Sequence, residues 1–131
     1  MYSSYDVGKQ LDRQRGYLAL DNFDYESLFS TSFGMNKADR IATFDSGSTH
    51  AMTLTAVDLD KDGNPVKWKV ENSWGPATGF GGCYIMTNDW FNEYMFRLVV
   101  SNEYVPETLL KEYEQKPLMV MPEDPLFSVD E

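Results

Sequence analysis

The chain has 131 residues, which is enough for one domain with a modest core. Aromatic residues make up 15% of it, which argues against disorder, and a formal net charge of −10 argues against a nucleic-acid-binding surface, which needs clustered Lys and Arg. No apolar run approaches the length of a membrane span, and one cysteine allows no intrachain disulfide. We therefore expect a one-domain protein of the cytoplasm, a reducing compartment, with neither a membrane nor a nucleic acid as partner.

The first half of the chain contains short helices and two longer strands. Asn36 can cap a helix that follows it, because its side chain can accept a hydrogen bond from a backbone amide of the first turn. Residues 49–58 and 66–72 alternate apolar and polar side chains, as strands do. The expected elements are a strand at 2–5, helices at 25–29 and 37–43, and strands at 49–58 and 66–72.

The residues between the two alternating segments are similar to the opening of a calcium loop, with aspartates at positions 58, 60 and 62 and Gly63 after them. A calcium loop needs an oxygen ligand at its twelfth position, where this chain has Lys69, and helices on both sides. Aspartates followed by Gly63, Asn64 and Pro65 are typical of a hairpin turn. We expect a turn here and no metal site.

The second half of the chain contains shorter elements and ends in a proline-containing tail. Thr87 or Asn88 can cap a short helix, and Pro106 fits the first position of another. Prolines at 117, 122 and 125 oppose regular helix, so residues 115–131 should form an extended tail. The expected elements are a strand near Cys83, a helix at 88–94, a strand at 96–100 and a helix from 106 to about 113. The pattern is α+β with mainly antiparallel pairing.

His50 and Asn72 are the candidate catalytic residues. They belong to the two strands that the hairpin would join, so an imidazole and a carboxamide would lie close together. A Cys-His-Asn peptidase needs this pair, because the amide oxygen holds the imidazole in one orientation while the other ring nitrogen faces the thiol. A lone His on a strand is more often structural, so periodicity alone leaves both interpretations open.

The residues around this pair resemble a known family. The run Asn72-Ser73-Trp74-Gly75 and the glycine-rich residues 79–85 are similar to the catalytic Asn segment of papain-type cysteine peptidases and the strand after it. Further collinear blocks resemble the branch of bleomycin hydrolase and bacterial aminopeptidase C: residues 6–9, 25–26, 35–40, 49–52, 89–94, 105–107, 114–115 and 124–125. The resemblance implies an α+β fold over residues 1–131, the antiparallel β-rich lobe of a papain-like cysteine peptidase with short peripheral helices.

The resemblance implies a role for each residue of the site. His50 would take the proton of a cysteine thiol and later protonate the leaving amine. Asn72 would orient the imidazole without adding a full charge beside it. Trp74 would cover the Asn–His hydrogen bond and exclude water, and its alternative role is that of a large aromatic residue that fills the core. No metal or other cofactor is implied.

The nucleophile of the family, a Cys followed by Trp and preceded by an oxyanion-hole Gln, does not occur in this sequence. In papain relatives the His and Asn follow that Cys by about 130–150 residues. The Cys would then lie upstream of Met1, and the chain would be the C-terminal part of the enzyme, inactive alone. Cys83 is not the candidate, because it lies in a strand pattern and not at a helix N-terminus, where thiolates are stabilised. We expect it to be a small buried apolar residue.

The resemblance also implies partners. They are peptide substrates, the missing N-terminal lobe of the same enzyme, and further copies of it, since relatives form hexamers. In the aminopeptidase C branch the C-terminal carboxylate, here that of Glu131, is thought to meet the α-amino group of the substrate. This chain ends in Asp130-Glu131 instead of small apolar residues, so a solvated acidic end is the alternative. Without the missing lobe, uncovered apolar surface should make the chain self-associate.

Two functions of different class follow. The first is that of a C-terminal fragment of an intracellular cysteine aminopeptidase that removes N-terminal residues from peptides, with the Cys supplied from upstream. The second is that of a noncatalytic β domain that binds a peptide or protein partner.

Overall fold

The structure, a computed structural model, describes residues 1–127. Its strands form one sheet with the order β2-β3-β6-β5-β4-β1-β7. The strands are β1 (Tyr2–Tyr5), β2 (Leu11–Asp12), β3 (Tyr17–Leu18), β4 (His50–Leu59), β5 (Pro65–Glu71), β6 (Cys83–Thr87) and β7 (Met95–Val99). All neighbouring strands are antiparallel except β3 and β6, which are parallel. The predicted α+β class is confirmed, with one parallel pair in an otherwise antiparallel sheet.

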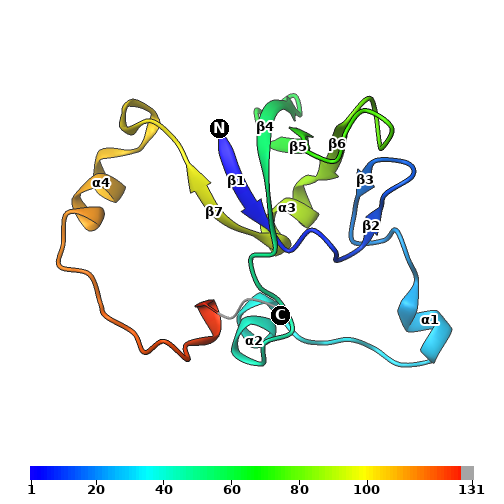
Figure 1. Cartoon of the computed structure of the whole chain (residues 1–131), viewed down its shortest axis with the longest axis horizontal. Coiled ribbons are helices and arrows are strands. Elements are labelled where there is room, and N and C mark those ends of the chain that lie inside the picture. The colour runs from blue at the N-terminus through cyan, green and yellow to red at the C-terminus, as the bar shows by residue number, and fades with distance from the viewer. Residues whose placement is uncertain (128–131) are drawn as a thin grey trace.

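Short helices surround the sheet. They are α1 (Tyr25–Phe29), α2 (Lys37–Ala42), α3 (Asn88–Tyr94) and α4 (Glu107–Tyr113), with 3-10 turns η1 (Asn102–Tyr104) and η2 (Pro125–Phe127). Helix α3 lies against the sheet, whereas α1 and α4 lie away from it on opposite sides (Figure 1). Asn36 caps α2 by accepting the Asp39 amide at 2.9 Å, as predicted. Thr87 caps α3 through the Trp90 amide at 3.2 Å.

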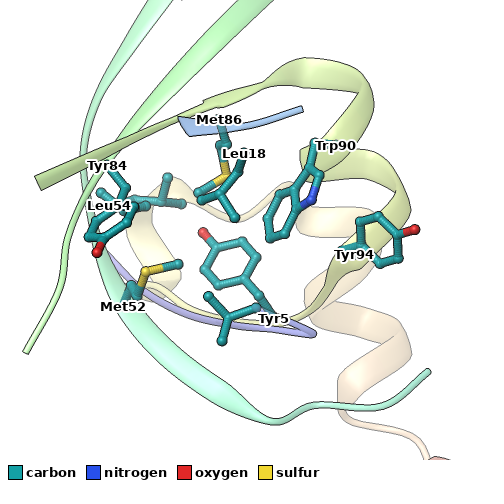
Figure 2. Close-up of a cluster of buried hydrophobic side chains, with 10 residues drawn as sticks. Tyr5, Leu18, Met52, Leu54, Tyr84, Met86, Trp90 and Tyr94 are labelled. Carbon is teal, nitrogen blue, oxygen red and sulfur yellow. The ribbon is translucent and has the colours of Figure 1, made fainter. Parts of the chain in front are cut away.

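The core lies between α3 and one face of the sheet (Figure 2). Alternation along the strands supplies that face, with Met52 and Leu54 from β4 and Val70 from β5 all buried. Helix α3 contributes Trp90, whose ring centroid lies 5.8 Å from that of Tyr5. Burial of Tyr5 raises the pKa of its phenol, an effect that the hydrogen bond with Ser3 partly opposes.

Helix α2 is tied to α3, and this contact fixes the segment that leads into β4. The Lys37 ammonium donates to the carbonyls of Asn92 and Met95 at 2.9 and 2.6 Å, and so satisfies the C-terminal end of α3. Desolvation, with a smaller contribution from the nearby Arg40 charge, lowers the pKa of Lys37. Arg40 also forms an ion pair with Glu93.

Three features differ from the sequence-based expectations. The β2–β3 hairpin was not predicted, because strands of two residues are too short to show a period. Pro106 is the cap of α4 rather than its first residue, a shift of one position at a helix end. The tail lacks regular helix over residues 115–124, as predicted, but then forms the turn η2.

Large apolar side chains are exposed on α1, on α4 and along the tail. Leu28 is 71% exposed, Tyr113 91% and Leu118 88%, and Met119 and Met121 are similarly uncovered. Exposed apolar surfaces of this kind usually mark a site of contact with another protein. The self-association expected of the chain stays a prediction. None of the helices in residues 1–127 has the length and apolar character needed to cross a membrane.

Candidate active site

The β4–β5 hairpin positions the candidate catalytic pair. Its turn is closed by Asp60, whose carboxylate accepts the backbone amides of Asn64 and Asp62 at 2.9 and 2.8 Å. These hydrogen bonds, with that of the Asn64 amide the largest cause, lower the pKa of Asp60. The register shifts between Asp58 and Leu59 and again between Leu54 and Ala56, and beyond these irregularities Thr53 pairs with Glu71. His50 therefore lies three residues before one member of this pair, and Asn72 directly follows the other.

Strand alternation turns both side chains toward the same face of the sheet. His50 shares a face of β4 with Met52 and Leu54, and Asn72 continues the face of β5 that carries Val70. This is the core face, and both residues lie where it ends. The pair is thus held by the packed core on one side and opens outward on the other.

The predicted contact between His50 and Asn72 is present. The imidazole Nε2 lies 2.8 Å from Asn72 Oδ1, and the Ser73 backbone N–H donates to the same oxygen at 2.7 Å. Because that atom already accepts from an amide, it must be the carbonyl oxygen, and Nε2 must carry the hydrogen. In the neutral ring Nδ1 then carries the lone pair. Within residues 1–127 no hydrogen bond engages Nδ1.

Asn72 itself is fixed by the loop that follows it. Its backbone N–H donates to the Gly82 carbonyl at 3.0 Å, and the residue is 9% exposed. The Asn72 Nδ2 group is buried with no hydrogen-bond partner among residues 1–127. The loop therefore fixes the backbone of Asn72, while the carbonyl oxygen of its side chain serves the imidazole.

Two glycines, Gly16 and Gly79, lie in close backbone contact near this loop. A Cβ on Gly79 would lie 2.4 Å from the Cys83 carbonyl oxygen, and one on Gly16 would lie 2.5 Å from the Gly79 Cα. Both glycines have positive φ, at 57° and 65°. The β2–β3 turn and the loop before β6 thus approach each other at a distance that only glycine allows, next to the residues that carry Asn72.

Trp74 lies against the imidazole, as predicted. The Trp74 and His50 rings stack with centroids 4.9 Å apart and an angle of 27° between their planes. Tyr84 contacts the same indole edge-on at 5.8 Å, and the Arg13 guanidinium lies 4.6 Å from its ring centroid. Sequence reasoning missed Arg13, because its β2–β3 hairpin gives no periodic signal. The predicted role of the indole, to cover the His–Asn hydrogen bond and exclude water, stays a prediction.

The remaining candidates lie elsewhere. Cys83 begins β6 opposite Glu71, so it points away from the core face on which His50 lies, and it is half-buried rather than fully buried. No hydrogen bond joins its thiol to His50 among the described residues. Glu131 lies outside the described residues. Within residues 1–127 no three His, Cys, Asp or Glu side chains lie together in a way that could hold a metal ion.

Replacing Asn72 with Ala should remove the downfield ¹H NMR resonance expected for the His50 Nε2 proton. The chain has one histidine, so this resonance has a single source, and without its acceptor the proton exchanges with water. Asn92→Ala, on the exposed side of α3, is the matched control and should retain it. Persistence of the resonance in Asn72→Ala would show that another group holds the ring.

Comparison with known proteins gives consistent results. The sequence profile of the Peptidase C1-like family matches residues 1–127. The chain is 42% identical over 121 residues to aminopeptidase C of Lactococcus lactis subsp. lactis, and 42% identical over 129 residues to bleomycin hydrolase of Homo sapiens. These matches cover 92% and 96% of this chain, respectively, and 28% of each relative.

A solved structure has the same fold. The crystal structure of PepW from Lactobacillus rhamnosis, determined as the selenomethionine derivative, superposes with a TM-score of 0.88 at 39% identity. The match covers 98% of this chain and 29% of PepW. The chain thus spans well under a third of the length of the relatives that it matches.

Proposed function

Because this chain belongs to the Peptidase C1-like family, we propose that it is the His- and Asn-bearing part of a cysteine aminopeptidase that removes N-terminal residues from peptides. Aminopeptidase C and bleomycin hydrolase are its relatives at about 40% identity. The hydrogen bond between His50 Nε2 and Asn72 Oδ1, at 2.8 Å, carries the proposal most directly, because it leaves Nδ1 free to face a thiol.

In this proposal His50 is the acid and base of the reaction. Nδ1 takes the proton of the cysteine, which leaves a thiolate beside an imidazolium, and the thiolate attacks the carbonyl carbon of the peptide. The imidazolium then protonates the leaving amine, and the neutral ring activates the water that hydrolyses the thioester. Each of these proton transfers requires that the Nδ1 atom of His50 is accessible and that the imidazole ring keeps its orientation.

Asn72 and Trp74 are positioning residues in this scheme. The Asn72 oxygen accepts from Nε2 in both protonation states of the ring, so it holds the same orientation through the cycle. The stacked indole of Trp74 keeps that hydrogen bond in a less polar environment, which strengthens it. The Trp74 indole also contacts Tyr84, so the same side chain helps to fill the core.

The nucleophile belongs to a part of the enzyme outside this chain. Supporting this, the relatives are more than three times as long, and Cys83 lies on the opposite face of the sheet from His50. The exposed apolar side chains of α1, α4 and the tail offer surface to the missing lobe and to further copies in a hexamer. Alone, the chain should be inactive.

The C-terminal carboxylate of Glu131 is proposed to attract the α-amino group of the substrate. A negative end near the cleft favours a free ammonium group and so cleavage at the N-terminus. The acidic residues at 130 and 131 add negative charge to that end.

The test joins this chain to an N-terminal lobe that carries the family's Gln and Cys-Trp motif. The joined protein should release N-terminal residues from peptides, an N-acetylated peptide of the same sequence should resist, and a thiol-alkylating reagent should abolish cleavage. The chain alone, assayed in parallel, should be inactive. Absence of thiol-dependent cleavage by a folded joined protein would reject the proposal.

A noncatalytic β domain that binds a peptide or protein partner is the second candidate. The uncovered apolar residues 118–121 and α1 favour it, since such surfaces bind partners whether or not a nucleophile is present. The reading frame upstream of Met1 separates the two candidates. A Gln followed by Cys-Trp in that frame supports the enzyme, and a start codon at Met1 with no such motif supports the binding domain.

A further inference from the structure

His50 is the first residue of β4, and residues 46–49 before it belong to no helix or strand. The end of a strand opens more easily than its middle, because the ladder of hydrogen bonds continues on one side only. A side chain that must keep its orientation at such a place needs an anchor beyond the strand. Residues 46–49 provide this anchor, because their side chains bind residues 5–7 at the end of β1.

The Thr49 side chain forms the last hydrogen bonds between this segment and the end of β1. Its hydroxyl donates to the Tyr5 carbonyl at 3.3 Å and accepts the Val7 backbone N–H at 3.2 Å. The Thr49 backbone N–H donates to the same Tyr5 carbonyl at 3.0 Å. Val7 is buried, so its N–H has little access to water and depends on this hydroxyl. A side chain thus takes the place of a backbone group where the regular pairing of β1 and β4 stops.

Ser46 is a second anchor of the same segment. Its hydroxyl donates to the Asp6 carboxylate at 2.7 Å, and both residues are buried. Phe44, two residues earlier, is exposed. A segment that buries a serine and exposes a phenylalanine is held by its hydrogen bond more than by apolar packing. Hydrogen bonds from a hydroxyl to a carboxylate are among the stronger ones in proteins, so this contact suits an anchor.

We propose that Thr49 and Ser46 are positioning residues, which hold the start of β4 so that the imidazole stays on its amide acceptor. The inference rests on the proposed function and adds the residues that orient its acid and base. The acceptor is Asn72 Oδ1, which lies 2.8 Å from His50 Nε2 and belongs to a different segment of the chain. A shift of the His50 backbone would lengthen this hydrogen bond and turn Nδ1 away from the thiol. Proton transfer requires donor and acceptor within hydrogen-bond reach, so such a shift slows it.

Thr49→Val, which replaces the hydroxyl by a methyl group of similar size, tests this in the joined enzyme. It should lower kcat about tenfold, since a small misplacement of a reacting group slows the reaction, and leave KM within about twofold. Thr49→Ser keeps the hydroxyl and should keep kcat. Thr55→Val is the matched control, because this threonine of the same strand donates to the Lys69 carbonyl at 3.2 Å, and its kcat should not change. An unchanged kcat in Thr49→Val, or a rise in KM alone, would overturn the proposal.

NMR of the chain alone separates this inference from the proposed function. The His50 Nε2 proton resonance should broaden or vanish in Thr49→Val and in Ser46→Ala, at temperatures where circular dichroism shows both to be folded. Thr49→Ser and Thr55→Val should retain it. Thr49 is exposed, so its variants should fold and decide the matter even if Ser46→Ala unfolds. If the joined enzyme cleaves no peptide, the proposed function fails while this measurement still decides the inference. A resonance in folded Thr49→Val as sharp as that of the parent chain would reject it.

Discussion

His50→Ala in the joined enzyme should lower kcat/KM for thiol-dependent hydrolysis by about 10²–10⁴-fold, the contribution typical of a positioned acid and base. The alanine cannot take the thiol proton or return one to the leaving amine. The fold should survive, because His50 is half-buried at the start of β4 and the Asn72 oxygen keeps its hydrogen bond from the Ser73 amide. Rates against a matched peptide, with circular dichroism melting of both proteins, measure the two effects.

The control for this variant is Cys83→Ser. Its side chain lies on the other face of the sheet from His50, so activity and its sensitivity to thiol reagents should both persist. Loss of activity in Cys83→Ser with the fold retained would make that cysteine the nucleophile and contradict the proposal. A His50→Ala enzyme that still turned over would remove His50 from the mechanism.

The contact between His50 and Asn72 could be predicted because it depends on local features. Two strands with clear alternation are joined by one turn of Asp, Gly and Asn, so their pairing follows from the sequence between them. Alternation alone then places each side chain on a face. The cap of α2 at Asn36 was predictable for the same reason, since a cap is decided within four residues.

The surroundings of the site could not be predicted in this way. Tyr5 and His50 lie far apart in the sequence and become cross-strand partners only because β1 is inserted between β4 and β7. Arg13 reaches Trp74 from a hairpin whose strands have two residues each. The periodicity of the sequence indicates on which face of a sheet a side chain lies, but it does not indicate which strands are neighbours in that sheet.

The orientation of the ring depends in turn on the core beneath it. Tyr5 is the cross-strand partner of His50 in the β1–β4 pair, and its ring packs on Trp90 from α3. Trp90, which packs against Tyr5 and so against the strand that begins at His50, is remote in sequence from both His50 and Asn72. This arrangement couples the stability of the domain to the geometry of the site.

Trp90→Ala should therefore lower the free energy of unfolding by about 3–5 kcal/mol, the range for removing a large buried aromatic. Trp90 is 0% exposed, contacts Tyr5 and Tyr94 with centroids 5.8 and 5.3 Å away, and donates its indole N–H to the Lys9 carbonyl at 2.8 Å. The variant leaves a cavity and an unpaired carbonyl. Because a domain of this size is stable by about 5–15 kcal/mol, much of its stability would be lost.

Urea denaturation followed by the fluorescence of the two remaining tryptophans measures this loss. Tyr113→Ala is the matched control, since that aromatic side chain is 91% exposed and its removal should change stability by less than about 0.5 kcal/mol. In Trp90→Ala the cavity opens beside Tyr5, so the His50 Nε2 proton resonance should also weaken below the unfolding midpoint. A Trp90→Ala domain as stable as Tyr113→Ala would mean that α3 does not hold β1, and with it β4, in place.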